Sequence, residues 1–322
     1  MGLMCDGVDN PSQRAGMTKV AFCFPGQGSQ RVGMARDLVA QFPEAAAVFE
    51  EASDELDFDL RKVCFEGPIE ELSETQVTQP ALVTASLAAL RTVQERLGIL
   101  PYAVVGHSVG EYAAIAAADS VSVGLVTRLV RERGLAMAAS KAKGAMAAVL
   151  GLADEEVERL CAEAGDVWPA NYNCPGQLVI SGRELGVTSV GEKARELGAK
   201  VVRLRVSGAF HSPLVEDAAN RLEPALRAAH FGELKTKFMS TVSSKLETAD
   251  RIPGLLIEQV TAPVRFTQSV QALIGDGVRT FVEVGPGGVL SGLVKRIDRS
   301  VTAISVGTSD ELRAAEASLA GS

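Results

Sequence analysis

VVGHSVGE, residues 104–111, is the stretch that decides the fold of this chain. An apolar run leads into a Gly-x-Ser-x-Gly turn centred on Ser108, and the alanine-rich residues 112–118 that follow are typical of a helix. A serine on a turn between a strand and a helix is a nucleophile elbow, because the flanking glycines leave its hydroxyl free. The first N–H groups of the helix would face an oxyanion formed there. The motif predicts Ser108 as an activated nucleophile, and a plain structural turn is the alternative.

Strand and helix patterns alternate on both sides of this unit. Residues 20–24 have the continuous apolar pattern of a buried strand, and residues 280–284 have the same pattern. Helix patterns cover residues 33–41, 43–56, 80–97 and a segment that ends near residue 297. This alternation favours a fold of the α/β class, in which a parallel sheet carries helices on both faces.

The pattern changes between residues 141 and 207. Strand patterns cover residues 144–151, 177–181 and 200–206, and helix patterns cover residues 154–164, with Asp154 as N-cap, and 191–197. This order is close to β-α-β-β-α-β and suggests a small inserted ferredoxin-like unit. We therefore expect a large subdomain of residues 17–140 and 208–322 and a small α+β subdomain of residues 141–207. Residues 1–16 are expected to be a disordered extension.

Composition argues against several classes of protein. The chain has 322 residues, is 47% hydrophobic and carries a net charge of −8, so bulk electrostatics disfavour nucleic acid and anionic membranes as partners. Its five cysteines are scattered, without a Cys-x-x-Cys or His/Cys cluster, which predicts a reducing compartment and no metal site. Neither a membrane span nor a signal peptide is visible, and we expect a cytoplasmic protein.

The chain has three histidines, so few residues could act as a base for Ser108. His107 is adjacent to the serine, and because consecutive side chains diverge we interpret it as a residue that orients the elbow. His230 follows a helix pattern, where a histidine commonly interacts with the helix dipole. His211 lies in a loop after a strand, which is where open α/β sheets place functional groups. We therefore predict His211 as the general base, with a buried structural histidine as the alternative.

Arg133 is the second candidate for chemistry. In the helix pattern of residues 126–137 it lies on the apolar stripe, whose other members are Val126, Leu129, Val130 and Met137. Because an unpaired buried charge is very costly, an arginine on this stripe requires an anion. The anion could be an internal Asp or Glu, or a substrate carboxylate held by a bidentate clamp. The spacing leaves both interpretations open.

Gln27 lies in a glycine-rich loop, residues 25–30, directly after the first strand pattern. The loop is not a phosphate-binding P-loop, because the required Lys-Ser/Thr pair is missing. Its position would allow the backbone N–H of Gln27 to join that of Val109 in an oxyanion hole. A plain tight turn is the alternative.

Together these motifs resemble the malonyl-CoA:acyl carrier protein transacylase family and the related acyltransferase domains of polyketide synthases. The resemblance covers roughly residues 19–306 and rests on motifs that occur in the same order. In this sequence they read FPGQGSQ at 24–30, QPA at 79–81, GHSVGE at 106–111, RG at 133–134, NYNCPGQ at 171–177, GAFHS at 208–212 and EVGPG at 283–287. The resemblance implies an α/β-hydrolase-like large subdomain with a parallel sheet and an inserted ferredoxin-like subdomain.

The resemblance also implies an activity. A malonyl group would pass from malonyl-CoA to the phosphopantetheine thiol of acyl carrier protein through a malonyl-serine, in a ping-pong reaction without a bound cofactor. The protein would be a monomer that supplies extender units for fatty-acid synthesis. A trans-acting acyltransferase of polyketide synthesis is one alternative. A serine thioesterase or esterase is another, and it predicts an Asp or Glu on the histidine and no role for Arg133. An intact Ser108, His211 and Arg133 set argues against a module that only docks carrier protein.

Site residues follow from the resemblance by position. Ser108 would be the nucleophile and His211 its base. Arg133 would pair with the malonyl carboxylate. The backbone N–H groups of Gln27 and Val109 would form the oxyanion hole, and Val109 replaces a leucine that is frequent in the family.

Further residues complete the implied site. Phe210 would crowd an α-methyl branch and so favour a malonyl group. The carbonyl of Arg265 would orient His211 in place of a triad Asp, although relatives often have Gln or Asn at that position. The remaining implied substrate-binding residues are His107, Met137 and Asn171. Basic residues that could dock an acidic carrier protein, or simply form a solvated face, are Arg128, Arg131, Lys141 and Lys143.

Overall fold

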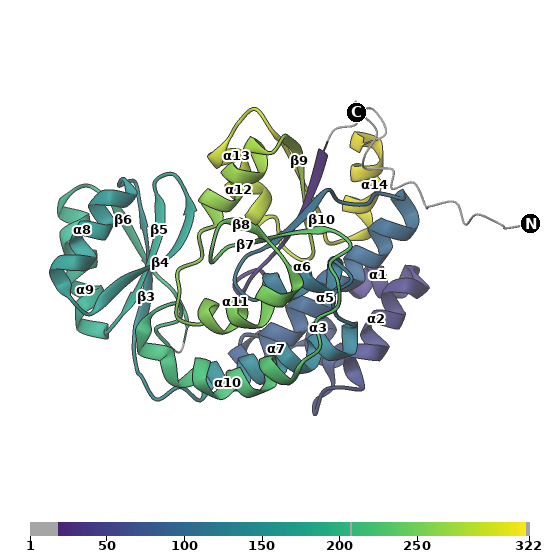
Figure 1. Ribbon diagram of the computed structural model, residues 1–322, viewed down its shortest axis with the longest axis horizontal. Coiled ribbons are helices and arrows are strands. Elements are labelled where there is room, and N and C mark those ends of the chain that lie inside the picture. Colours follow the sequence, from purple (N-terminus) through teal and green to yellow (C-terminus); the bar gives the residue numbers. More distant parts are fainter. Residues whose placement is uncertain (1–18, 207, 320–322) are drawn as a thin grey trace, which may run out of the picture.

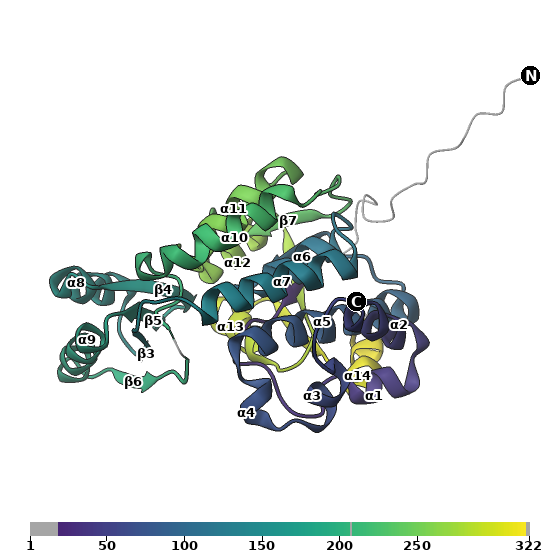
Figure 2. The same cartoon turned by 90° about the horizontal axis from the view of Figure 1, so that it is seen from below.

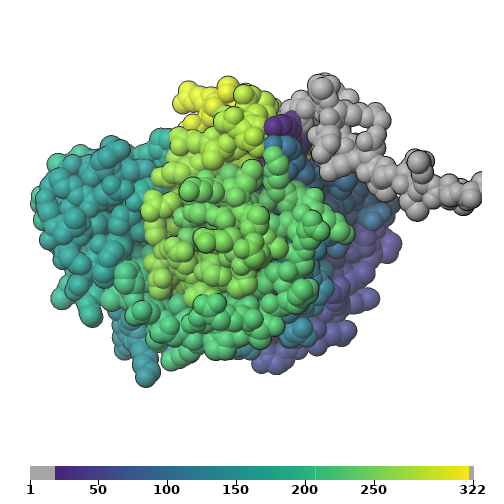
Figure 3. Space-filling model, in the orientation of Figure 1, coloured from purple at the N-terminus to yellow at the C-terminus, as the bar shows by residue number. Residues whose placement is uncertain are grey.

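The computed structural model describes residues 19–206 and 208–319, and these form two lobes of unequal size (Figure 1). The predicted disordered extension, residues 1–16, lies outside the described residues. Residues 145–203 form the smaller lobe at one end of the molecule, and the space-filling view shows it packed against the larger one (Figure 3). None of the helices in the described ranges is long and apolar enough to cross a bilayer.

A six-stranded sheet organises the larger lobe, in the order β10-β9-β1-β2-β7-β8. Its strands are β1 (Lys19–Phe24), β2 (Ala103–Gly106), β7 (Lys237–Ser240), β8 (Lys245–Glu247), β9 (Val278–Val284) and β10 (Thr302–Val306). Every neighbouring pair is parallel except β7 and β8, which are antiparallel. The predicted parallel sheet of an α/β fold is therefore confirmed.

Helices cover both faces of this sheet, as the views in Figures 1 and 2 show. They are α1 (Arg36–Gln41), α2 (Pro43–Ser53), α3 (Leu60–Glu66), α4 (Ile69–Leu72), α5 (Thr75–Leu97), α6 (Gly110–Ala117), α7 (Val123–Ala138), α10 (Glu216–Ala228), α11 (Ile252–Gln259), α12 (Phe266–Gly275), α13 (Val289–Ile297) and α14 (Ser309–Leu319). Alternate strand residues enter different cores: Phe22 and Phe24 pack in one cluster, while Ala21 and Cys23 pack in another with α12 and α13. Two buried faces explain why β1 reads as a continuous apolar run.

A four-stranded antiparallel sheet forms the smaller lobe, in the order β4-β5-β3-β6. Its elements are β3 (Ala145–Leu150), α8 (Asp154–Ala164), β4 (Val167–Cys174), β5 (Gln177–Gly182), α9 (Glu184–Glu196) and β6 (Lys200–Arg203). The two helices pack on the sheet around a separate apolar core. The β-α-β-β-α-β connectivity confirms the ferredoxin-like prediction.

Strand β4 was not among the predicted strands. Its sequence, VWPANYNC, contains a proline and two asparagines, which are unfavourable in a strand. The strand tolerates Pro169 because β4 is at the edge of the sheet and its pairing is irregular beside that residue. The prediction of Asp154 as an N-cap is also wrong, because Ala153 has the extended backbone of the cap and Asp154 is the first helical residue.

Several helix boundaries differ from the sequence predictions. Helix α5 begins at Thr75, so Pro80 lies inside it. A proline there deprives the carbonyl of Gln76 of its helical partner, and the guanidinium of Arg131 donates to that carbonyl instead, at 2.8 Å. Helix α1 begins at Arg36 because left-handed residues precede it, and α9 begins seven positions before the predicted residue 191.

The elbow is built by close contact between backbones. Ser108 has a positive φ of 54° between β2 and α6. A Cβ at Gly106 would lie 2.0 Å from the carbonyl carbon of Gly110, and a Cβ at Gly110 would lie 2.1 Å from the carbonyl oxygen of Phe24. A larger residue at Gly106 would push the start of α6 away from β2, and one at Gly110 would push it away from the end of β1. The glycines therefore place Ser108 at the carboxyl ends of these strands.

Replacing Gly110 by alanine tests this packing. Because the new methyl group would overlap backbone that cannot yield, we expect Gly110→Ala to lower the free energy of unfolding by about 3 kcal/mol or to prevent folding. Gly292→Ala is the matched control, since Gly292 lies inside α13 with nothing within 4 Å of an added Cβ. In the control variant the free energy of unfolding should rise by up to about 1 kcal/mol, because alanine has a higher helix propensity than glycine. Denaturant unfolding measures both, and wild-type stability in Gly110→Ala would contradict the contact.

Candidate active site

One cavity brings the predicted site residues together where the two lobes meet. Of the ten residues predicted from the sequence, nine line it: Gln27, His107, Ser108, Val109, Arg133, Met137, Asn171, Phe210 and His211. Arg265 does not. Sequence reasoning missed Met146, Leu204 and Val206, which line the cavity from β3 and from the segment after β6. These three are ordinary apolar residues, and their pattern carries no functional signal.

Ser108 and His211 are in direct contact. The hydroxyl Oγ of Ser108 lies 2.8 Å from Nε2 of His211. Ring atom Nδ1 faces two carbonyl oxygens, that of Gln259 at 2.9 Å and that of Ala262 at 3.2 Å. A carbonyl oxygen can only accept, so Nδ1 carries the proton and Nε2 is the acceptor for the serine hydroxyl. This tautomer is the one that a general base for Ser108 requires.

The prediction that the carbonyl of Arg265 orients His211 is wrong. Arg265 precedes α12, its backbone N–H donates to Thr241, and its guanidinium stacks over the Tyr172 ring. The carbonyls that hold His211 come from the C-terminal end of α11 and the turn after it, where chain carbonyls have no helical donor. Gln259 could have been noticed in the sequence, because it is a polar residue at the end of the apolar helix IPGLLIEQ.

Burial and charge set the protonation state of His211. The ring is buried, and burial together with the positive charge of Arg133 lowers the pKa of His211 to about 3. The imidazole is therefore neutral at physiological pH. Within residues 19–206 and 208–319 no carboxylate contacts it, so this site is a serine–histidine pair oriented by carbonyl groups.

Arg133 lies on the buried face of α7 and is only 1% exposed. Its guanidinium donates to Oε1 of Gln79 at 2.8 Å, to Oε1 of Gln259 at 3.1 Å and to Oγ of Ser108 at 3.1 Å. All three acceptors are uncharged, and its Nε has no partner among the described residues. No ion pair involves Arg133 in the part of the chain that the structure describes. Of the two interpretations left open, the geometry thus disfavours an internal salt bridge.

Two backbone N–H groups border the cavity beside Ser108. Those of Gln27 and Val109 have no acceptor within the described ranges, and both residues line the cavity. The first turn of α6 begins immediately after Val109, so the positive end of its dipole adds to the field at this point. Free donors beside a nucleophile are what an oxyanion hole requires.

The remaining predicted residues divide into structural and cavity-facing ones. His107 is held by Oδ1 of Asn173 at 2.9 Å, which fits its interpretation as an orienting residue. Asn171 lines the cavity, and its Oδ1 is buried and has no partner in the described part of the chain. Phe210 and Met137 supply apolar walls. His230, the rejected candidate, is exposed after α10.

Two of the basic residues considered for docking already form salt bridges within the protein. Arg128 pairs with Glu55 at 3.1 Å, and Arg131 pairs with Asp57 at 2.7 Å. The Arg128–Glu55 pair lies at the surface, where such contacts contribute little to stability, and this favours the solvated-face interpretation for Arg128. The Arg131 side chain is only 15% exposed and also holds the carbonyl of Gln76, so its role is structural.

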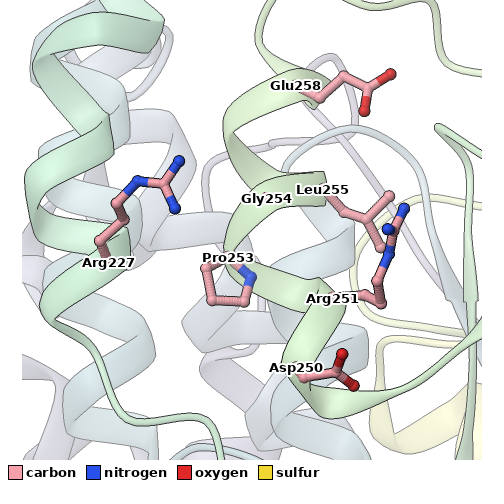
Figure 4. Close-up of a pocket in the computed structure, with 7 residues that line it drawn as sticks. All are labelled: Arg227, Asp250, Arg251, Pro253, Gly254, Leu255 and Glu258. Carbon is pink, nitrogen blue, oxygen red and sulfur yellow. The ribbon is translucent and has the colours of Figure 1, made fainter.

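A second hollow lies between α10 and α11 (Figure 4). Arg227 and Arg251 border it. Arg227 pairs with Glu223 of the same helix, and Arg251 pairs with Glu247 at the end of β8. The hollow shares no lining residue with the Ser108 cavity. Within the described ranges, His, Cys, Asp and Glu side chains form no group of three that could hold a metal ion.

The fold and this geometry define a serine-dependent enzyme that handles acyl groups. The model of the acyl transferase domain family matches residues 21–315. A malonyl CoA-acyl carrier protein transacylase of Bacillus subtilis (strain 168) is 45% identical over 299 residues, which are 90% of this chain and 94% of the relative. The enzyme of that name from Escherichia coli (strain K12) is 41% identical over 306 residues, 93% and 99% of the two chains.

Solved structures agree with the sequence relatives. A type II polyketide synthase acyl-carrier protein in complex with its malonyl-transacylase matches with a TM-score of 0.90 at 39% identity, over 94% of this chain and 100% of that chain. An acyl-carrier-protein S-malonyltransferase from Bartonella henselae matches with a TM-score of 0.90 at 40% identity, over 94% of this chain and 99% of that chain. The chain therefore belongs to the malonyl-CoA:acyl carrier protein transacylase family.

The low pKa of His211 predicts how Ser108 responds to pH. With its pKa near 3, the imidazole stays in the basic form at all values above about pH 5. We expect the rate of Ser108 labelling by a phosphonofluoridate to be constant between about pH 5.5 and 8. With an unperturbed histidine, the rate would fall to half of its high-pH value at about pH 6.5. His211→Ala should slow labelling by at least about 10²-fold, and His230→Ala should leave it unchanged. A fall in rate with a midpoint near 6.5 would contradict the assigned environment.

Proposed function

We propose that this protein transfers a malonyl group from malonyl-CoA to the phosphopantetheine thiol of acyl carrier protein through an ester on Ser108. The observation that carries the proposal is the buried guanidinium of Arg133, 3.1 Å from Oγ of Ser108 and bonded only to uncharged acceptors among the described residues. A charge buried in this way calls for an anionic group on the substrate, and a malonyl group carries one. The names of the relatives support the same reaction.

In the first half-reaction Ser108 is acylated. Its Oγ attacks the thioester carbonyl carbon while Nε2 of His211 takes the hydroxyl proton. The carbonyl oxygen becomes an oxyanion, which the N–H groups of Gln27 and Val109 stabilise. When the tetrahedral intermediate collapses, the carbon–sulfur bond breaks and coenzyme A leaves with the proton from His211.

In the second half-reaction the carrier-protein thiol replaces coenzyme A. His211 takes the thiol proton, the sulfur attacks the ester carbonyl, and the same N–H groups stabilise the oxyanion. The bond to Oγ then breaks and Ser108 recovers its proton from His211. Pairing of the malonyl carboxylate with Arg133 fixes the ester in the cavity, and the apolar walls formed by Phe210 and Met137 limit the access of water.

Residue roles follow from this scheme. Arg133 selects acyl groups that end in a carboxylate, and Phe210 disfavours an α-methyl branch. Asn171 offers a buried acceptor to the bound substrate. A thioesterase remains the competing function, but the carbonyl groups on His211, in place of an Asp or Glu, and the position of Arg133 favour transfer.

The pathway, location and assembly state belong to the same proposal. We place the reaction in fatty-acid synthesis and the protein in the cytoplasm as a monomer. The enzyme needs no resident cofactor, because the chemistry needs only serine, histidine and arginine. The four cysteines within the described ranges are free and buried, which suits a reducing compartment. A polyketide role is the second candidate, and it is favoured by the similarity to a malonyl-transacylase complexed with a type II polyketide synthase carrier protein.

Intact-mass spectrometry tests the reaction directly. Mixing with malonyl-CoA should add one malonyl group to the wild-type protein and none to Ser108→Ala, because Oγ forms the ester. Adding a phosphopantetheinylated carrier protein should discharge the adduct and load the carrier. An adduct that water clears without loading the carrier would indicate a hydrolase, and a missing adduct would remove Ser108 as the nucleophile.

Replacing Arg133 tests the selection of the carboxylate. We expect Arg133→Ala to lower kcat/KM for malonyl-CoA by about 10²-fold relative to acetyl-CoA, because the charge-assisted bonds to the carboxylate are lost. Arg128→Ala is the matched control, since that arginine is paired with Glu55 on the exposed side of the same helix. Unchanged selectivity in Arg133→Ala would remove this residue from substrate recognition.

A further inference from the structure

Glu111 is a buried carboxylate that the reaction scheme does not use. It is the last residue of the elbow motif, lies in the first turn of α6 and is 0% exposed. Its Oε1 accepts from the backbone N–H of Thr241 and, at 2.9 Å, from the hydroxyl of the same residue. Its Oε2 accepts from Nε2 of Gln259. Both oxygens act as acceptors, which is how an ionised carboxylate bonds.

Gln259 lies between Glu111 and Arg133. Its amide nitrogen donates to Glu111 and also to the backbone carbonyl of Ser108 at 3.1 Å, while its amide oxygen accepts from Arg133 at 3.1 Å. Because carboxylate and carbonyl oxygens can only accept, these contacts fix which end of the amide faces Arg133. One neutral side chain therefore separates a buried anion from a buried cation.

The separation has an electrostatic consequence. Burial lowers the pKa of Arg133, and the neighbouring Tyr112 and Glu111 both oppose that effect. Burial also raises the pKa of Glu111 to about 7, against the hydrogen bonds from Thr241 and Gln259. A direct ion pair would compensate both charges more completely, but it would also occupy the guanidinium that the substrate carboxylate needs.

We infer that Glu111 is the counter-ion of Arg133, held at the distance of one amide by Gln259, so that the buried cation is compensated yet still free to bind the substrate carboxylate. This inference deepens the proposed function and rests on it. Glu111 and the side chain of Gln259 are positioning residues, because they act through Arg133. The carbonyl of Gln259 holds His211, so the same residue also connects the base to the clamp.

A charge-conserving swap tests the spacing. In Glu111→Gln/Gln259→Glu, the new amide at 111 can still accept from Thr241 and donate to position 259, but the carboxylate now contacts Arg133 directly. We expect the variant to fold and the ratio of kcat/KM for malonyl-CoA to that for acetyl-CoA to fall by about 10²-fold. If Gln259 only fills space, the swap keeps the malonyl preference, and that result overturns the inference.

The single variant Glu111→Gln tests the counter-ion. Removing its negative charge leaves Arg133 uncompensated, so malonate should raise the melting temperature of this variant more than that of the wild type. In the swap variant malonate should have almost no effect. Equal malonate shifts in Glu111→Gln and wild type would overturn the inference. If Glu111→Gln does not fold, the swap decides, because it retains every charge.

A second buried carboxylate provides the matched control. Glu283 is 1% exposed and accepts from backbone N–H groups at the start of α13, away from Arg133. Glu283→Gln should lower stability while leaving the malonate shift at the wild-type value. A malonate shift that grows equally in both glutamine variants reflects lost stability alone and counts against the inference. Failure of the proposed function would show separately, as a wild-type protein that forms no malonyl adduct.

Discussion

The burial of a positive charge beside Ser108 is the constraint on which the rest of the site depends. Arg133 is fixed on the inner face of α7, and three polar groups that converge on it come from α5, α11 and the elbow. Such a charge is tolerated only when its donors are satisfied and an anion is near. The neutral histidine and the position of Glu111 are consistent with this requirement, because the charge of Arg133 lowers the pKa of His211 and Glu111 helps to raise that of Arg133.

Helix α11 transmits that constraint to the catalytic pair. Its C-terminal residue, Gln259, holds Arg133 with its side chain and His211 with its carbonyl. Carbonyls at the end of a helix lack intrahelical donors, so the end of α11 is a ready acceptor for Nδ1 of His211. A triad carboxylate would place a negative charge close to Arg133 and compete with the substrate for it. Orientation by neutral carbonyls avoids this competition while still selecting the tautomer that leaves Nε2 as a base.

The sequence predicted most of the site but not its supports. Ser108 and His211 could be found because glycine spacing and loop position are local signals, and Arg133 because helical periodicity shows which face it occupies. The family resemblance implies the carbonyl of Arg265 as the group that orients His211, whereas the carbonyls of Gln259 and Ala262 do so. Any residue can offer a backbone carbonyl, and only the fold selects one. Similarly, the sequence predicts a helix that starts at Pro80, whereas α5 continues through Pro80 because Arg131, 51 positions away in the chain, satisfies the carbonyl that the proline frees. The edge strand β4 was missed because its pairing partner compensates for an unfavourable sequence.

By itself, the sequence determined the α/β class, the inserted ferredoxin-like unit, the nucleophile elbow and the presence of a cation on a buried helix face. These features depend on the spacing of apolar, glycine and charged residues within one element, and such spacing is visible in the chain. Only the tertiary structure decided which groups surround Arg133, which carbonyls orient His211 and that Gln259 stands between Arg133 and Glu111. Those relations join α11 to residues of α7 and α6 that lie 126 and 148 positions earlier in the chain. Hydrogen-bond partners at such separations are set by how the helices pack on the sheet, and no local pattern encodes them.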